Sequence, residues 1–370
     1  MGGPAILFYA GGMTLHFPAP GPLLPVPPAP SPLAAAMALA ESRETFFPRD
    51  LRAHLDGGYF EAPPDNTVIG PVAPRGGPNG LVLQHGKVVG GWGDTRQTDM
   101  TFSVAKSYLS LLAGIAVGDG LITDLDEPVA ASVSHPAFAG SQNSPVTWRM
   151  LLQQTSEWEG SLFGKSERID RGRNLSSEGK GKGANRPLSA PGDHWEYNDV
   201  RVNALSLALL HRFGRPLPQV FAERIMAPIG GSADWVWDGY ETSWVEIAGE
   251  KLHSVPGGGH WGGGVRMHAE DQARIGLLML ADGVWDGQRV LPEGWVAAST
   301  TPCELNGDYG LLWWLNAGGR LAGAPLTGFY AAGAGGNTIW VEPTQSLVVV
   351  ARWLHPESAG EVLQAIHAAI

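Results

Sequence analysis

The chain has 370 residues, of which 44% are hydrophobic and 16% charged, a length and composition suited to one large globular domain or two closely packed ones. Its net charge is −11 and its basic residues are scattered, which argues against nucleic acid or an anionic membrane as the main partner. The single cysteine, Cys303, excludes an internal disulfide framework. No run of about 18 apolar residues is present that could span a membrane.

The first 44 residues are predicted to form a poorly packed N-terminal extension. Residues 17–36 read FPAPGPLLPVPPAPSPLAAA, a composition typical of an extended lead. Residues 1–42 contain no Lys or Arg, so the positively charged start of a secretory signal is missing. We therefore expect a cytoplasmic protein. The sequence leaves open whether Met1 or Met37 is the natural start.

The next elements predict a mixed fold. A short helix near 48–55 precedes two strand-like pieces, 80–86 and 87–93, which favour a hairpin that turns at Gly86. A buried helix follows at 103–118. From about 120 to 260 we expect a helical subdomain, because its elements are the helical segments 147–160 and 202–213 on either side of a polar loop, 164–190.

Strand-like material returns in the last third of the chain. A predicted helix at 269–283 leads to strands at 309–316, 336–343 and 346–353, and a helix at 357–370 closes the sequence. Strands at both ends with helices between them predict an α+β fold. In such a fold the functional site lies between the sheet and the helical insertion.

The buried helix carries a candidate nucleophile. Its sequence, TFSVAKSYLSLLAGIAVGDGL, places Ser103 at the first turn and Lys106 three residues later on the same face. Burying an ammonium is costly unless it is paired, and a lysine beside a serine hydroxyl is what nucleophilic activation requires. A serine N-cap with a lysine that reaches solvent is the alternative that this segment alone leaves open. A second Ser-x-x-Lys, at 177–180, lies in the polar loop and is rejected.

Other motifs fail on spacing or context. Residues 160–166, GSLFGKS, leave three residues between Gly160 and Gly164, where a phosphate-binding loop needs about four. Residues 257–264, GGGHWGGG, contain a dinucleotide-type glycine pattern, but no convincing strand precedes it. The histidines show no metal-ligand spacing. We expect neither a metal nor a cofactor.

Three segments in order resemble one family. They are SVAKS at 103–107, WEYNDV at 195–200 and GAGGN at 333–337. In this order and spacing the chain resembles the serine β-lactamase and penicillin-binding-protein superfamily. It is most similar there to class C β-lactamase-like esterases and 6-aminohexanoate-dimer (nylon oligomer) hydrolases. The resemblance covers about residues 45–370 and implies an antiparallel sheet flanked by helices.

The resemblance also implies catalytic roles. Ser103 would be the nucleophile, Lys106 would help to deprotonate it, and Tyr197 would relay the proton to the leaving group. The oxyanion hole would consist of the backbone N–H groups of Ser103 and Asn337, with Gly336 as the alternative for the second donor.

Substrate contacts are expected from six residues: Trp158, Phe163, Asp199, His260, Trp261 and Gly336. The sequence does not decide whether Trp313 and Trp314 belong to the cleft or to the core. Aromatic walls would suit an apolar or linear acyl chain.

Two departures from the family pattern bear on function. The Tyr-x-Asn motif reads Tyr197-Asn198-Asp199, so an acid stands in the amide position. The Lys-Thr-Gly motif reads Ala334-Gly335-Gly336, so the cation and hydroxyl that hold a β-lactam carboxylate are absent. Both departures favour the esterase and amide-hydrolase branches.

We therefore expect a serine hydrolase that acts through an acyl-enzyme on small carboxylic esters or linear amides. The alternatives are β-lactamase or DD-peptidase activity, an acyltransferase with the same site, and a non-catalytic binding homologue. The expected partner is the small-molecule substrate, and a homodimer is left open.

Overall fold

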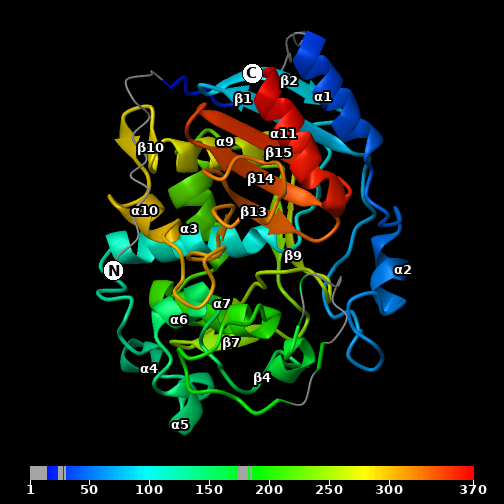
Figure 1. The fold of residues 1–370 in the computed structure, drawn as a ribbon. Coiled ribbons are helices and arrows are strands. Elements are labelled where there is room, and N and C mark those ends of the chain that lie inside the picture. The colour runs from blue at the N-terminus through cyan, green and yellow to red at the C-terminus, as the bar shows by residue number, and fades with distance from the viewer. Residues whose placement is uncertain (1–14, 24–27, 29–30, 174, 176–181, 184–185) are drawn as a thin grey trace.

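An antiparallel sheet to which both ends of the chain contribute forms the centre of the fold (Figure 1). The computed structural model describes residues 15–23, 28, 31–173, 175, 182–183 and 186–370. Six strands form the sheet, in the order β12-β13-β14-β15-β1-β2: β1 (Asn79–Gln84), β2 (Lys87–Trp92), β12 (Trp314–Leu315), β13 (Phe329–Gly333), β14 (Asn337–Glu342) and β15 (Leu347–Arg352). β1 pairs with β15 from Asn79 opposite Arg352 to Gln84 opposite Leu347. The predicted α+β fold, with its sheet built from both chain ends, is confirmed.

Helices cover both faces of this sheet. α9 (Ala269–Leu280) packs against β14, β15 and β1 on one face. α11 (Ala359–Ala369) lies across the other face, next to α1 (Ser31–Ser42) (Figure 1). β14 and β15 are buried along their whole length. This burial explains why their sequences are nearly continuous apolar runs.

The N-terminal segment is more closely packed than its composition suggests. α1 buries Leu33 and Met37 and contacts both α11 and β2. Further upstream, the backbone carbonyl of Gly21 accepts a hydrogen bond of 2.7 Å from Arg274. Alanine and leucine favour a helix, and one apolar face is enough to dock it. The predicted domain boundary at residue 44 therefore falls inside the packed fold, and α1 does not fit the poorly packed extension that we predicted.

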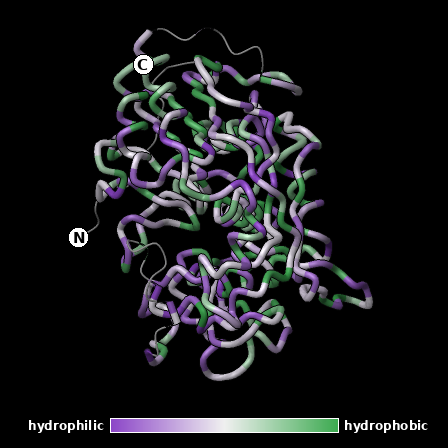
Figure 2. Tube along the Cα trace, turned by 90° about the vertical axis from the view of Figure 1, so that its right-hand side faces the viewer, coloured by the Kyte–Doolittle hydropathy of each residue, from purple (hydrophilic) through white to green (hydrophobic). Residues whose placement is uncertain are grey.

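α3 (Val104–Gly118) runs through the middle of the molecule. Every residue from Val104 to Ala116 is buried. The helix contacts β13 and β14 on one side and α7 (Asp199–Phe213) and α8 (Leu217–Phe221) on the other. Figure 2 is turned by 90° from Figure 1, so that the centre of the molecule is seen along the axis of α3. A helix that is apolar nearly all round is stable only in such a position.

The lower half of Figure 1 holds the helical subdomain and several short elements. Its helices are α4 (Val129–Ser132), α5 (Gly140–Asn143), α6 (Trp148–Gln153), α7 and α8. The short strands are β3 (Asp99–Met100), β4 (Ser161–Leu162), β5 (Lys165–Ser166), β6 (Val236–Asp238), β7 (Trp244–Ile247), β8 (Glu250–His253) and β9 (Gly264–Met267). Elsewhere lie α2 (Leu51–Asp56), β10 (Val284–Trp285), β11 (Gln288–Arg289) and α10 (Trp295–Ser299). Within the described residues, none of the helices has both the length and the apolar character needed to cross a membrane.

Three predicted segments differ from the structure. The helix predicted at 147–160 is the shorter α6, because Gln154 takes a left-handed φ of 63° and ends it. The strand predicted at 309–316 is reduced to β12. The polar loop 164–190 begins with β5 and a 3-10 turn, Glu167–Asp170, whose two acidic residues are buried. The rejected motif at 177–180 lies outside the described residues.

Candidate active site

Ser103 and Lys106 form a hydrogen-bonded pair at the start of α3. Ser103 is the N-cap residue, but its side chain makes no capping hydrogen bond. Its Oγ instead accepts a hydrogen bond of 2.8 Å from Lys106 Nζ. Lys106 is 1% exposed, so it does not reach solvent. The structure thus disfavours the alternative of a capping serine with a solvent-exposed lysine.

The surroundings of Lys106 show how its charge is held. Its ammonium forms an ion pair with Asp199 at the start of α7 and donates a hydrogen bond of 3.1 Å to the carbonyl of Gly257. It also lies 4.7 Å from the ring centroid of Tyr197. A Cβ on Gly258 would lie 2.8 Å from Asp199 Oδ1. The glycine run at 257–259 therefore lets the backbone close against the Lys106–Asp199 pair.

This pair belongs to a larger cluster of buried charges. Arg173 donates a hydrogen bond of 2.8 Å to Asp199 Oδ2, and His260 Nδ1 lies 3.2 Å from the same oxygen. Burial alone would raise the pKa of Asp199. The surrounding cations, His260 when protonated, Lys106, Arg173 and Lys182, outweigh burial and hold this pKa well below its usual range. Asp199 is therefore a carboxylate at neutral pH.

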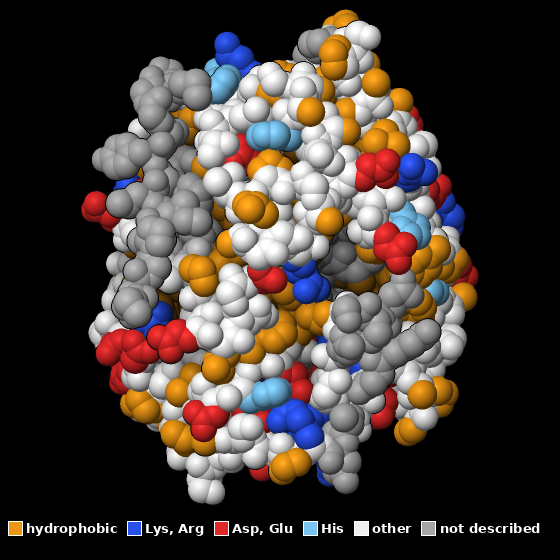
Figure 3. Space-filling view, in the orientation of Figure 1, with side chains coloured by type: hydrophobic (Ala, Val, Ile, Leu, Met, Phe, Trp, Pro, Cys, Tyr) orange, Lys and Arg blue, Asp and Glu red, His pale blue; other side chains and the backbone are white. Residues whose placement is uncertain are grey.

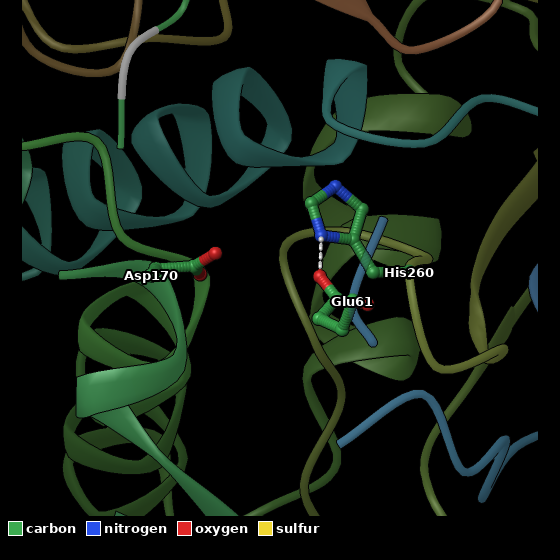
Figure 4. Close-up of side chains that lie close together, drawn as sticks. All are labelled: Glu61, Asp170 and His260. Carbon is green, nitrogen blue, oxygen red and sulfur yellow. Dashed lines mark ion pairs between the residues drawn. The ribbon is translucent and has the colours of Figure 1, made fainter. Parts of the chain in front are cut away.

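Three residues of the cluster have the ligand types of a metal site. The ligand atoms of Glu61, Asp170 and His260 lie within 4.8 Å of one another, and His260 Nδ1 points at Glu61 (Figure 4). However, Lys182 Nζ pairs with both carboxylates, at 2.7 Å from Glu61 and 2.9 Å from Asp170. The three carboxylates of Glu61, Asp170 and Asp199 thus pair with three basic side chains, Lys106, Arg173 and Lys182. We interpret the cluster as an internally neutralised ion network and not as a metal centre.

A cavity of about 490 Å³ opens above Ser103. Tyr197, His260 and Gly336 line it. Most of its remaining wall is aromatic or aliphatic, and two arginines reach it: Phe46, Phe47, Tyr59, Phe60, Trp314, Tyr330, Leu175, Leu321, Arg173 and Arg320. Such a wall suits an acyl chain with little polar substitution.

The turn between β13 and β14 lies against the start of α3. A Cβ on Gly333 would lie 2.1 Å from the carbonyl oxygen of Thr101 and 3.2 Å from the backbone nitrogen of Ser103, so only glycine fits here. Within the described part of the chain, the backbone N–H groups of Ser103 and Ala334 have no hydrogen-bond acceptor. Both residues line the cavity. Two free donors beside a nucleophile are what an oxyanion hole requires.

A family model described as beta-lactamase matches residues 77–365. The chain belongs to the beta-lactamase family. A 6-aminohexanoate-dimer hydrolase from Paenarthrobacter ureafaciens is 30% identical over 119 residues, which span only 28% of this chain and 28% of that protein. The crystal structure of a family VIII carboxylesterase aligns with a TM-score of 0.59 at 15% identity, over 94% of this chain and 100% of that one. The crystal structure of a penicillin-binding-protein homologue from Caulobacter crescentus aligns with a TM-score of 0.59 at 16% identity, over 92% of this chain and 98% of that one.

These matches confirm the family inferred from the sequence. The likeness to the solved structures lies below 25% identity and therefore shows the shared fold alone. The short match to the aminohexanoate-dimer hydrolase covers about a quarter of each chain. The substrate has to be argued from the site itself.

Three aromatic residues predicted to face the cleft of this β-lactamase-family fold do not line the cavity. The indoles of Trp158 and Trp261 donate hydrogen bonds to the carbonyls of Ala137 and Asp65, at 2.6 and 3.0 Å, and both rings are buried. Phe163, which takes a left-handed φ of 55°, packs against the core. The glycines near these rings let the loops fold inward, so the rings became core.

Two other expectations change with the structure. Asn337 is fully buried and outside the cavity wall. Its amide donates to the carbonyl of Ala334 at 2.7 Å, and its Oδ1 accepts from Arg352 at 2.6 Å. These side-chain bonds support the hairpin. Asn337, whose backbone N–H was expected to be the second oxyanion donor, does not line the cavity, whereas Ala334 does. Asp199 was expected to contact substrate, but it pairs with Lys106 and does not line the cavity.

Sequence reasoning missed several residues that the fold brings to this site. Trp314 lines the cavity whereas Trp313 is buried in the core, a distinction that the sequence left open. Glu61, Arg173 and Arg320 lie in loops without a recognisable motif. Their distance from the motifs along the chain left no local signal by which to find them.

Proposed function

We propose that the protein is a serine hydrolase that forms an acyl-enzyme on Ser103 and acts on small carboxylic esters or linear amides. The observation that carries this proposal is the 2.8 Å hydrogen bond between Lys106 Nζ and Ser103 Oγ at the base of an apolar cavity. A buried serine beside a buried lysine supplies a nucleophile with a neighbour that stabilises its anionic form.

We propose the following course for the reaction. Ser103 Oγ forms a bond to the carbonyl carbon of the substrate, and the carbonyl oxygen takes up negative charge opposite the N–H groups of Ser103 and Ala334. The serine proton passes to Tyr197 and from there to the leaving group, whose bond to the carbonyl carbon breaks. Water then cleaves the acyl-enzyme by the same route in reverse.

Two cations close to the Tyr197 ring support this relay. Lys106 Nζ lies 4.7 Å and the guanidinium carbon of Arg173 lies 5.1 Å from its ring centroid. Positive charge at such a distance stabilises negative charge that develops on the phenol oxygen. Asp199 in turn holds Lys106 against the serine.

The residues that line the cavity favour esters and linear amides over β-lactams as substrates. Ala332, Gly333, Ala334, Gly335 and Gly336 form its wall at the end of β13 and the following turn. None of these residues supplies the cation and hydroxyl that hold a β-lactam carboxylate in the family. A carboxylesterase and an aminohexanoate-dimer hydrolase are among the similar proteins. An acyltransferase would use the same residues and differ in the acceptor.

Covalent labelling tests the nucleophile. A fluorophosphonate probe should label the wild type, and Ser103→Ala should abolish both labelling and the hydrolysis of 4-nitrophenyl acetate, with a loss of about 10³-fold or more in kcat. Ser107→Ala is the matched control: it lies one helical turn away, and its hydroxyl donates to the carbonyl of Leu312 at 2.7 Å. This control should still be labelled. If purified Ser103→Ala kept more than about a tenth of wild-type activity, the acyl-enzyme proposal would be wrong.

A further inference from the structure

The charges of the cavity are opposite to those of the protein as a whole. The chain carries 36 Asp and Glu against 25 Lys and Arg, and acidic and basic side chains are interspersed on the face shown in Figure 3. Among the described residues that line the cavity, Arg173 and Arg320 nevertheless carry positive charge, and none is an Asp or Glu. A cavity lined by one sign of charge attracts a ligand of the other sign.

The two arginines differ in how their charges are balanced. Arg173 is paired with Asp199 at 2.8 Å and lies 3.7 Å from Asp170. Arg320 makes no ion pair with any carboxylate in the described part of the chain. Asp308 is in the same region, but its carboxylate accepts a hydrogen bond of 3.1 Å from the backbone of Gly318 and is not part of the cavity wall. Among the described residues, no carboxylate therefore balances the positive charge of Arg320 at the cavity.

Arg320 is an exposed residue that packs on the aromatic wall. Its guanidinium carbon lies 4.6 Å from the ring centroid of Trp314. It faces Tyr330 as well: burial raises the pKa of the Tyr330 phenol, and Arg320 opposes that rise. A guanidinium stacked on an aromatic ring keeps its planar set of donors oriented, so it loses less freedom when it binds a planar anion.

The aromatic wall connects this guanidinium to the nucleophile. Trp314 stacks on Tyr197, with ring centroids 5.6 Å apart and planes at 27°. On β13 its neighbour is Tyr330, with centroids 6.4 Å apart and planes at 20°. The row Tyr197, Trp314, Tyr330 therefore leads from the catalytic end of the cavity to Arg320. An apolar chain along this row would bring its far end to a cation.

We propose that Arg320 forms a carboxylate-binding subsite, so that the preferred substrates are esters or amides that carry a second, free carboxylate beyond an apolar spacer. The inference rests on the proposed function and specifies its substrate class. The carboxylate belongs either to the acyl group or to the leaving group. In both cases a planar anion meets the fork of guanidinium N–H donors.

Two matched substrate pairs test this subsite and distinguish the two sides. Monophenyl adipate against phenyl hexanoate places the charge on the acyl group, and 3-acetoxybenzoate against phenyl acetate places it on the leaving group. At low salt, kcat/KM of the wild type should be about 10-fold higher for the anionic member of at least one pair. Sodium chloride at 0.5 M should reduce that ratio.

Variants then assign the preference to Arg320. Arg320→Gln should lower the ratio of anionic to neutral kcat/KM by about 10-fold, and Arg320→Lys should restore only part of it because lysine lacks the planar fork. Arg289→Gln, which removes an arginine of β11 outside the cavity wall, is the control and should keep the wild-type ratio. Equal rates on both members of both pairs in the wild type would overturn the subsite, as would an unchanged ratio in Arg320→Gln. Failure to hydrolyse any of the four esters, without fluorophosphonate labelling, would instead overturn the proposed function.

Discussion

Asp199→Asn is the substitution that tests the buried charge network most directly. Asparagine keeps the shape of the side chain and restores the amide of the family's Tyr-x-Asn motif. It removes the negative charge that faces Lys106, Arg173 at 2.8 Å and His260 at 3.2 Å. The basic side chains of the cluster would then face only two carboxylates, Glu61 and Asp170. These basic side chains are Lys106, Arg173 and Lys182.

The expected cost follows from this imbalance. Removing one partner of a buried ion pair costs about 3–5 kcal/mol, and we expect about 3 kcal/mol here because the amide oxygen still accepts a hydrogen bond from Lys106. At about 2 cal/mol/K per residue, the unfolding entropy of a chain of 370 residues is about 0.8 kcal/mol/K. The Tm should therefore fall by about 4 °C.

The loss of stability in Asp199→Asn should depend on pH in a characteristic way. The folded state lowers the pKa of Asp199 below its unfolded value, so its contribution to stability is present above the unfolded pKa of about 3.9 and is lost as the pH falls through the folded pKa. The stability difference between the wild type and Asp199→Asn should therefore be fully present at pH 5, where Asp199 is ionised. It should shrink as the pH drops below about 4.

Thermal unfolding followed by circular dichroism measures both effects. Asp238→Asn is the matched control, because Asp238 pairs with Arg266 at 3.1 Å with both side chains about a third exposed, and such a pair contributes less than about 1 kcal/mol. A Tm of Asp199→Asn within 1 °C of the wild type at pH 7 would refute the reasoning. A deficit that grows as the pH falls below about 4 would refute it as well.

Three further outcomes are expected for the catalytic residues. Tyr197→Phe and Lys106→Ala should each lower kcat/KM for an ester by about 10²- to 10⁴-fold, and a loss below threefold for Tyr197→Phe would make its turn structural. Nitrocefin should be hydrolysed at least about 10-fold less efficiently than 4-nitrophenyl acetate, since the turn between β13 and β14 supplies neither the cation nor the hydroxyl that hold a β-lactam carboxylate beside the nucleophile; comparable kcat/KM would favour β-lactamase activity. Gly258→Ala should lower kcat/KM about 10-fold because its Cβ would lie 2.8 Å from Asp199 Oδ1, whereas Gly307→Ala, which meets no atom within 4 Å, should act as the wild type.

Local sequence patterns determined much of this protein. Periodicity and apolar runs predicted the hairpin of β1 and β2, the buried helix α3 and the strands β14 and β15, because burial on one or both faces leaves a regular signature. The serine and lysine of α3 lie three residues apart, so the helix itself brings them together. Proline and alanine content misled the prediction for α1, since composition does not show that a helix has a partner to dock against.

Only the tertiary structure decided which other residues reach the site. Glu61, Arg173 and Arg320 come from separate loops, and the chain between them carries no periodic signal that would report their approach. Packing of the loops around Trp158 placed that ring in the core and left Trp314 on the cavity wall. Ion pairing across such distances depends on how the sheet and the helical subdomain close on each other. A single sequence encodes that closure only through the sum of many weak contacts.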